Sequence, residues 1–342
     1  MTTDFSRRRF LGLTAAGTAA LVLAACGGDD DETTSTSDAT TATSGPGKDF
    51  GGKTITTAVY AKNHASAPLS WQRFAPPGLT VKPVIVTSAG DVSRALASGH
   101  LDFGLMGPYN TIIEASTTGM PSRIIGMCAR QGIGLIGRKD RGIAAVGDLE
   151  GKKVAVPPPG MQTLLLTSAL ERAGLELDAD VMSVPLGYAD HPGALERGDV
   201  DAYVGTEPQC TQSVVAGVGV RISGIYDSPA GDFNTAMWAS PKNLGDHDLL
   251  TAVTRMQRDA AELLTPRGVN DPAEWKELLV DQFGYTEPVY QAVLENIGAE
   301  WRFDDRRRSQ VEGAADLMLA QGVIETKPPI DDLLLLDHQP RG

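Results

Sequence analysis

The sequence predicts an α/β protein built from two similar lobes, with two short segments that cross between them. Short β-branched runs alternate with helical stretches that end at glycine, and one set of residues recurs 99 positions further along the chain. Of the 342 residues, 42% are hydrophobic and 21% are charged, which is typical of a folded globular protein.

The charge balance and the cysteine count exclude several classes of protein. The chain has 43 acidic and 30 basic side chains, and its formal net charge of -13 disfavours nucleic acid, whose phosphates are bound by clustered Lys and Arg. Three cysteines are too few for a disulfide scaffold, and a chain of this length buries enough surface without one. We expect no nucleic-acid partner and no cofactor.

The first 25 residues resemble an export signal. Arg7, Arg8 and Arg9 precede an uncharged stretch over residues 10–25, which is shorter than the roughly 20 residues that span a membrane. The arginines resemble a twin-arginine signal, and Leu23-Ala24-Ala25-Cys26 resembles a bacterial lipoprotein box. The resemblance implies cleavage before Cys26, a lipid such as palmitate on its thiol, and anchoring to the cell membrane. A plain amino-terminal anchor helix is the alternative.

Residues 26–52 are predicted to form a disordered tether. An acidic run over residues 29–32 leads into a segment rich in Thr, Ser, Ala and Gly that ends near Gly47. Such a segment has no apolar periodicity and little surface to bury, so it does not fold alone. A tether behind a lipidated cysteine would let a globular body stand off a membrane.

Strands and helices alternate in the globular body. Residues 54–60, 81–87 and 101–105 are predicted strands, and Asp91 can cap a helix that reaches Ser98. Further elements follow along the chain. Pro108 is predicted to begin a helix, and residues 154–156 are a predicted strand. A helix that ends before Gly174 is predicted from the helical spacing of Leu166, Ala169, Leu170 and Ala173.

A repeat divides this body into two lobes. Asp91, Ala95-Leu96, Gly99 and Asp102 match Asp190, Ala194-Leu195, Gly198 and Asp201, each 99 residues further on. In both copies a strand ends in a loop, a short helix and a strand follow, and Pro108 or Pro208 opens the next helix. Because ligands bind outside the carboxyl ends of such strands, the facing loops of the two lobes form the expected binding site.

The same stretches resemble a known family. Residues 95–104 (ALASGHLDFG) resemble the first-lobe signature of solute-binding proteins of ABC importers for nitrate, sulfonate, taurine and thiamine precursors. Residues 148–156 (DLEGKKVAV) resemble the opening of the second lobe, and residues 194–202 (ALERGDVDA) with Glu207-Pro208 resemble its close. The resemblance covers about residues 53–337 and implies the two-lobed type II periplasmic-binding-protein fold. In that fold each lobe is a sheet flanked by helices, and two crossing strands form the hinge.

This resemblance implies a division of the chain. The expected parts are a signal over residues 1–25, a tether over 26–52, the first part of lobe one over 53–140, lobe two over 141–223, and a return to lobe one with carboxyl-terminal helices over 224–342. The crossings are expected near residues 137–142 and 223–226.

The resemblance also implies a function. We expect a lipid-anchored extracytoplasmic solute-binding protein, a monomer without enzymatic activity, that captures a small organic molecule of the nitrate, sulfonate, taurine or pyrimidine-like class by lobe closure. It would deliver this molecule to the permease and ATPase of an ABC importer. Two alternatives are a tethered enzyme on the same fold, acting on a small precursor molecule, and a sensory binding module. An activated nucleophile or a coupled acid and base would favour the enzyme, and the sequence shows neither.

Two glycine-rich strings match nucleotide-binding motifs by their letters only. Residues 47–54 fit the P-loop string but precede a predicted strand, and residues 132–137 fit the dinucleotide fingerprint but precede charged Arg138-Lys139-Asp140.

The five histidines, His64, His100, His191, His247 and His338, show no paired metal spacing, so no metal site is expected. Cys128 and Cys210 are expected to be buried free thiols in different lobes.

Candidate ligand contacts lie in the loops that follow strands. They are Asn63, His64, Ser88, Ala89, Gly107, Tyr109, Gly160, Met161, Gln162, Tyr188 and Glu207. Free backbone N–H groups at residues 160–162 could hold an acceptor or anion, and Tyr109 and Tyr188 could stack on a planar ligand. The alternative for each residue is a loop side chain that satisfies its own turn, and Trp238 is expected in the core.

The charge of the ligand depends on Glu207. The proposed loops offer few cations, only Lys62 and His64. A Glu207 carboxylate that points inward would repel a bare anion and favour a neutral or nitrogen-bearing ligand over nitrate or an alkyl sulfonate. The alternative is that Glu207 faces away and caps the helix that Pro208 begins.

Overall fold

The computed structural model describes residues 48–60, 62–117, 119 and 121–341. The expected signal, Cys26 and most of the tether lie outside these residues. Within the described part of the chain, no helix is both long and apolar enough to cross a membrane.

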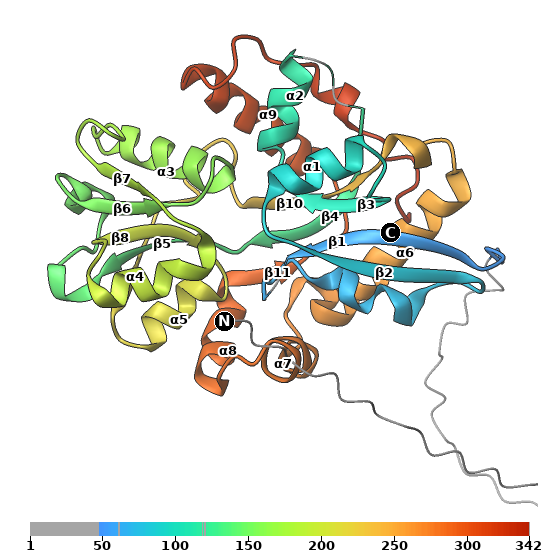
Figure 1. Ribbon diagram of the computed structural model, residues 1–342, viewed down its shortest axis with the longest axis horizontal. Helices are drawn as coiled ribbons and strands as arrows, with labels where there is room; N and C mark the ends of the chain where they lie inside the picture. Colours follow the sequence, from blue (N-terminus) through green and yellow to red (C-terminus); the bar gives the residue numbers. More distant parts are fainter. Residues whose placement is uncertain (1–47, 61, 118, 120, 342) are drawn as a thin grey trace, which may run out of the picture. The chain divides into compact units, whose positions relative to one another are not determined.

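The first sheet has six strands in the order β11-β4-β10-β3-β1-β2 (Figure 1). They are β1 (Lys53–Tyr60), β2 (Leu79–Val86), β3 (Phe103–Met106), β4 (Arg123–Gln131), β10 (Phe233–Ala239) and β11 (Ile297–Ala299). β1 runs parallel to both of its neighbours, whereas β10 runs antiparallel to β3 and β4. The strands expected at residues 54–60 and 81–87 are confirmed, with small shifts of their ends.

The second sheet has five strands in the order β7-β6-β8-β5-β9. They are β5 (Ile133–Arg138), β6 (Lys153–Val156), β7 (Met182–Pro185), β8 (Ala202–Thr206) and β9 (Gly219–Ile222). β6 runs parallel to β7 and β8, and β5 runs antiparallel to β8 and β9. Read from its other edge, the second sheet has the order β9-β5-β8-β6-β7, and its strand directions match those of β4-β10-β3-β1-β2 in the first sheet. The two-lobed α/β class is therefore confirmed.

Helices cover both faces of each sheet. They are α1 (Ala89–Ala97), α2 (Tyr109–Thr117), α3 (Met161–Arg172), α4 (His191–Arg197), α5 (Gln209–Val215), α6 (His247–Leu264), α7 (Pro272–Lys276), α8 (Glu287–Val293) and α9 (Asp305–Ala320). In Figure 1, α1, α2 and α9 lie on one face of the first sheet, and α6 packs on the other, against β4 and β11. We call each sheet with its helices the first or the second lobe. Trp238 of β10 is fully buried, as expected.

The duplicated aspartates make the same hydrogen bonds in both lobes. The Asp102 N–H donates to the Thr56 carbonyl at 3.2 Å, and its carboxylate accepts from the Thr56 N–H at 2.8 Å. The Asp201 N–H donates to the Lys153 carbonyl at 2.8 Å, and its carboxylate accepts from the Lys153 N–H at 3.1 Å. Each aspartate therefore fixes the chain entering β3 or β8 to the parallel strand β1 or β6.

The first crossing lies earlier in the chain than expected. β5 pairs with β8 from Ile133 to Gly137 and so belongs to the second lobe, although the expected boundary at residue 140 left it in the first. The chain leaves the first sheet at Gln131 and Gly132, both with left-handed backbone. Only glycine fits at 132, because a Cβ there would lie 1.9 Å from the His64 ring. The expected crossing at residues 137–142 is therefore wrong, whereas the linker between β9 and β10 contains the expected crossing at 223–226.

The misleading motifs and the cysteines behave as the sequence suggests. The residues after Gly52 form β1 rather than a helix, and residues 133–137 lie in β5. Neither string thus has the strand–loop–helix context of a phosphate-binding loop. Cys128 of β4 and Cys210 of α5 are buried free thiols in different lobes.

Asp102 is expected to stabilise the fold more than its counterpart Asp201. Burial alone would raise the pKa of Asp102, but hydrogen bonds from Asn243 and Thr56 and the Lys242 ammonium hold it below its ordinary value. Asp102→Ala should lower the free energy of unfolding by about 2–3 kcal/mol at pH 7, because Thr56 and Asn243 lose their acceptor. Asp201→Ala should cost about 1 kcal/mol, because Asp201 is more exposed and makes fewer bonds.

Urea unfolding of both variants at pH 7 and pH 3 checks this difference. A depressed carboxyl pKa stabilises the fold above the unfolded-state pKa and ceases to do so as the pH falls through the folded-state value. The loss of unfolding free energy caused by Asp102→Ala should therefore be smaller at pH 3 than at pH 7. If the two variants lost the same free energy of unfolding at pH 7, Asp102 would not stabilise the fold more than Asp201.

Candidate functional site

A cavity of about 640 Å³ lies between the strand-end loops of the two lobes. This size is typical of small-molecule sites. The first lobe contributes Tyr60, Asn63, Val86, Thr87, Ser88, Ala89, Gly90, Asp91, Arg94, Gly107, Tyr109, Asn110, Asn234 and Thr235. The second lobe contributes Ile133, Pro158, Pro159, Gly160, Met161, Gln162, Gly187, Tyr188, Ala189, Thr206 and Gln209.

Most of the candidate contacts from the sequence line this cavity. They are Asn63, Ser88, Ala89, Gly107, Tyr109, Gly160, Met161, Gln162 and Tyr188. They converge because the loops after parallel strands meet at one edge of each sheet. His64 and Glu207 are not part of the lining.

Helices α1, α2 and α3 begin at the cavity. Ser88 caps α1, since its side chain accepts from the Asp91 N–H at 3.1 Å. Tyr109 is the first residue of α2, and Gly160 precedes α3. Backbone N–H groups in the first turn of a helix lack intrahelical partners, so these segments can donate hydrogen bonds to a bound molecule.

Three tyrosines come to the cavity from different elements. Tyr60 ends β1, Tyr109 begins α2, and Tyr188 follows β7. Burial raises the pKa of all three hydroxyls, that of Tyr188 to about 12, so each is protonated at neutral pH. The Tyr188 ring packs edge-on against His191, with 5.9 Å between ring centroids. Each tyrosine therefore offers an aromatic surface and a neutral hydroxyl.

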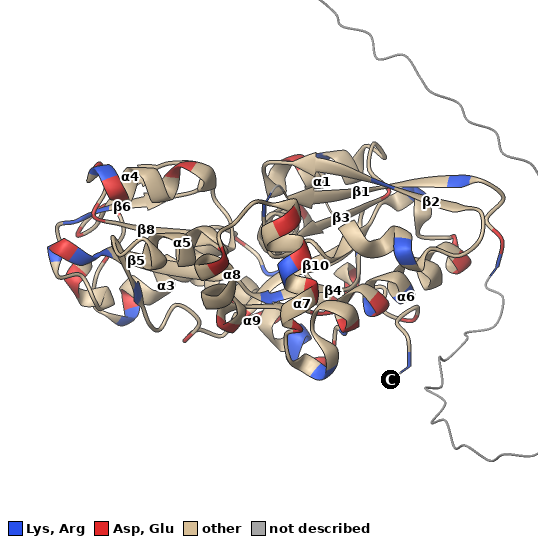
Figure 2. Ribbon diagram, turned by 90° about the horizontal axis from the view of Figure 1, so that it is seen from below, with Lys and Arg blue, Asp and Glu red and all other residues tan. Residues whose placement is uncertain are grey.

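The charged residues of the lining neutralise one another. Among the described residues that line the cavity, only Asp91 and Arg94 are charged, and they form an ion pair at 2.6 Å with side chains 49% and 74% exposed. Elsewhere on the two lobes, Lys and Arg are interspersed with Asp and Glu (Figure 2). The sequence reasoning missed Arg94, although its i+3 spacing from Asp91 places both on one helix face. Asn234 and Thr235 had no local signal, because they reach the cavity from β10.

Glu207 is buried away from the cavity. Its side chain is fully inaccessible, forms an ion pair with Arg221, and accepts a hydrogen bond from the Thr211 N–H at 3.0 Å. Burial raises the pKa of Glu207, while Arg221 and Thr211 act in the opposite direction. The expectation of an inward-pointing carboxylate is therefore wrong, and the alternative, in which Glu207 caps the helix begun by Pro208, holds. The sequence could not show this, because Arg221 lies on a different strand.

His64 lies at the first crossing rather than in the cavity. It is 1% exposed, and its Nδ1 atom is 3.4 Å from the Glu207 carbonyl oxygen. Burial lowers the pKa of His64 to about 4, so the ring is neutral at pH 7. The ring occupies the space that a side chain at position 132 would need. His64 therefore contributes to packing at the crossing and does not contact the cavity.

A family model described as NMT1/THI5 like matches residues 74–263, which is more than half of the chain. The chain belongs to this NMT1/THI5-like family. The matched region contains strand-end loops of both lobes and most of α6, but not the loop that follows β1.

One group of relatives of this NMT1/THI5-like protein comes from Brucella. A protein of Brucella abortus (strain 2308) that carries the name of a binding protein is 30% identical over 159 residues. A protein of Brucella suis biovar 1 (strain 1330) matches equally well. Each match covers 45% of this chain and 44% of the relative, so the chain aligns with less than half the length of these curated relatives.

Solved structures of the same fold include binding proteins and an enzyme. The alkanesulfonate-binding protein SsuA from Xanthomonas axonopodis pv. citri, bound to MOPS, is 19% identical with a TM-score of 0.69, over 83% of this chain and 98% of that protein. The nitrate-binding protein NrtA from Synechocystis PCC 6803 is 16% identical with a TM-score of 0.59, over 79% and 82%. The desulfurization enzyme DszB is 15% identical with a TM-score of 0.59, over 84% and 97%. At these identities the likeness shows the fold alone.

Glu207→Gln should destabilise this NMT1/THI5-like protein without weakening ligand binding. The neutral amide leaves the Arg221 guanidinium without its carboxylate, so the free energy of unfolding should fall by about 2–3 kcal/mol. Glu196→Gln on the exposed face of α4 is the matched control and should stay within about 0.5 kcal/mol. Urea unfolding measures both. A variant that keeps its stability and loses ligand affinity would contradict the buried ion pair.

His64 should make stability depend on pH between about 4 and 6.5. Because the folded-state pKa of His64 is lowered to about 4, the unfolded chain binds more protons than the folded chain in this range. Stability should therefore fall as the pH drops from 6.5 to 4, by at most about 3 kcal/mol from this residue. Urea unfolding at pH 7 and pH 4.5 measures the free energy of unfolding of the wild type and of His64→Gln. The difference between the two free energies should be smaller at pH 4.5. Parallel pH profiles for the two proteins would refute this role.

Proposed function

We propose that the chain is an extracytoplasmic solute-binding protein of an ABC importer, which closes its two lobes around a small organic molecule. The observation that carries the proposal is the cavity, whose lining comes from equivalent strand-end loops of both lobes. A ligand there gains contacts to both lobes only in the closed form, so binding shifts the population toward closure. Membership of the NMT1/THI5-like family and the fold shared with sulfonate- and nitrate-binding proteins support it.

The proposed ligand contacts are the sequence candidates that line the cavity. The nine residues are Asn63, Ser88, Ala89, Gly107, Tyr109, Gly160, Met161, Gln162 and Tyr188. In this proposal the tyrosines supply apolar contact and hydroxyls, and the helix starts supply backbone N–H donors.

The two crossings are suited to a hinge. The Tyr226 hydroxyl accepts from the Ile133 N–H at 2.7 Å and donates to the Ile133 carbonyl at 2.8 Å, which joins the second crossing to the first. Gly132 and Gly224 have left-handed backbone, which glycine adopts without strain. Rotation about these short segments would move one lobe against the other.

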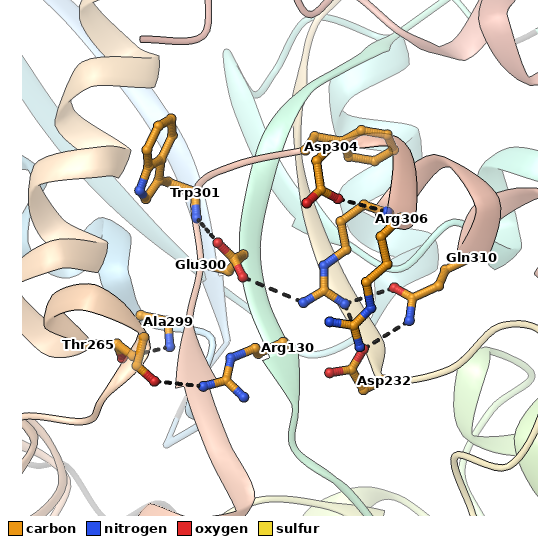
Figure 3. A network of polar contacts seen from close by, with 12 residues as sticks. Arg130, Asp232, Thr265, Ala299, Glu300, Trp301, Asp304, Arg306 and Gln310 are labelled. Carbon is orange, nitrogen blue, oxygen red and sulfur yellow. Dashed lines mark hydrogen bonds and ion pairs between the residues drawn. The ribbon is translucent and has the colours of Figure 1, made fainter. Parts of the chain in front are cut away.

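The end of the second crossing is firmly held by the first lobe. The Asp232 carboxylate accepts from Arg307 at 2.6 Å. It also accepts at 2.9 Å from Arg306 and Gln310, which Figure 3 labels, and all three donors lie on α9. Arg307 is only 3% exposed, so its ion pair with Asp232 is shielded from water, whereas the Arg306 side chain is 65% exposed. The hinge motion that we propose is therefore confined to the residues before Asp232.

The cavity favours capture over chemistry. Among the described residues of its lining there is no His or Cys, the side chains best suited to act as base or nucleophile near neutral pH. The tyrosines have raised pKa values, and Asp91 is paired with Arg94. Such groups position a molecule but do not activate one.

Export and anchoring complete the proposal. The chain would be exported by its signal over residues 1–25, carry lipid on Cys26, and stand off the membrane on the tether over residues 26–52. It would act as a monomer and deliver its ligand to the permease and ATPase of the importer.

A thermal-shift screen over sulfonates, nitrate, pyrimidines and polyamines tests the function. At least one compound should raise the Tm, because a ligand that binds only the folded state adds about 2.7 kcal/mol of stability at 100 times its Kd. Small-angle scattering should show a smaller radius of gyration with that compound bound. Tyr188→Ala should weaken its binding at least tenfold, whereas Trp301→Ala, an aromatic residue outside the cavity, should not. A bound compound that leaves the radius of gyration unchanged would contradict closure.

A further inference from the structure

The repeat places a carboxamide at the same position in each lobe. Asn110 follows Pro108 and Tyr109 at the start of α2, and Gln209, 99 residues further on, follows Pro208 at the start of α5. The preceding strands, β3 and β8, occupy equivalent positions in the two sheets. Both carboxamides line the cavity, so they reach it from opposite lobes.

Neither carboxamide is used by the protein itself. The Oε1 atom of Gln209 is inaccessible to water and has no hydrogen-bond partner in the described part of the chain. Asn110 likewise makes no side-chain hydrogen bond with any described residue. Asn63, by contrast, donates to the Thr206 hydroxyl at 3.0 Å and accepts from the Ala65 N–H at 2.8 Å. Buried polar groups in native proteins nearly always have partners, so the unpaired Oε1 atom of Gln209 leaves this carboxamide free to turn toward the cavity and pair with a bound molecule.

The neighbours of these two residues carry no free charge. Arg94 is paired with Asp91, and the tyrosine hydroxyls are neutral. An anion taken out of water needs charged donors or many convergent ones. A carboxamide both donates and accepts, whereas a carboxylate or sulfonate offers acceptors only and would leave the buried Gln209 oxygen unpaired.

We propose that Asn110 and Gln209 select an uncharged planar molecule that carries hydrogen-bonding groups at two opposite edges, one edge for each lobe. This inference rests on the proposed solute-binding function and defines its ligand class. The three tyrosines provide aromatic surface for the faces or the rim of such a molecule. Because the two carboxamides belong to different lobes, both are engaged only when the lobes close on the ligand.

Calorimetry with two matched pairs of compounds tests this ligand class. Isonicotinamide and terephthalamide are uncharged and polar at opposite edges, whereas isonicotinate and terephthalate carry carboxylates on the same rings. Each amide should bind the wild type at least tenfold more tightly than its carboxylate counterpart. Asn110→Ala and Gln209→Ala should each weaken the amides at least tenfold.

Two further measurements separate recognition from a structural role. The Tm of unliganded Gln209→Ala should equal or exceed that of the wild type, because the substitution removes a buried polar group that has no partner. Gln291→Ala, in which an exposed carboxamide of α8 is lost, is the matched control and should leave affinity unchanged. A lowered Tm for Gln209→Ala together with unchanged affinity would show that Gln209 is structural, and would overturn the proposal.

The remaining outcomes distinguish this inference from the function on which it rests. Tighter binding of the carboxylates, taurine or nitrate would overturn the ligand class and leave solute binding intact. Binding of an uncharged compound that neither alanine variant weakens would overturn the role of the two carboxamides. If neither these pairs nor the wider screen of sulfonates, nitrate, pyrimidines and polyamines gives a shift in Tm, the ligand class and the proposed function both fail.

Discussion

The parallel alignment of β1 with β3, and of β6 with β8, is the constraint on which the rest of the structure depends. Asp102 and Asp201 each hold the chain that enters the second strand of the pair by one backbone and one carboxylate hydrogen bond. The strands therefore end at the same edge of their sheet, and the helices that follow them begin there. The cavity exists because two such edges, produced by a duplicated pattern, lie across from each other.

Features determined by local sequence could be predicted, and features determined by distant partners could not. Strands such as residues 54–60 follow from β-branched runs, and the strand-end loops around Ser88 and Gly160 follow from glycine, proline and capping residues next to them. The direction in which the Glu207 side chain points depends on Arg221, which lies on a different strand. Likewise, the position of the first crossing depends on the His64 ring filling the space beside Gly132, a contact between residues 68 positions apart that no periodicity reveals.

Two sets of polar groups in the molecule have different roles. Glu207, Arg221, Asp232 and Arg307 are paired among themselves and hold segments that come from different parts of the chain. The hydroxyls and carboxamides of the cavity are neutral, and several have no partner among the residues that the structure describes. A shared fold does not set which small molecule is bound, since its strand-end loops carry the chemistry. The likeness to proteins whose names specify sulfonate or nitrate therefore shows the fold of this chain and does not identify its ligand.

The path of the chain gives the two lobes different mechanical positions. The first sheet contains β1 near the start of the described chain, and Leu335 near its end donates to the Ile124 carbonyl of β4 in the same sheet. The second lobe, residues 133–222, is thus an insertion that enters and leaves the first lobe at neighbouring points. A force applied to the two ends of the body would pass through the first lobe and bypass the second. A rotation of the second lobe about its two crossings would therefore leave both ends of the body in place.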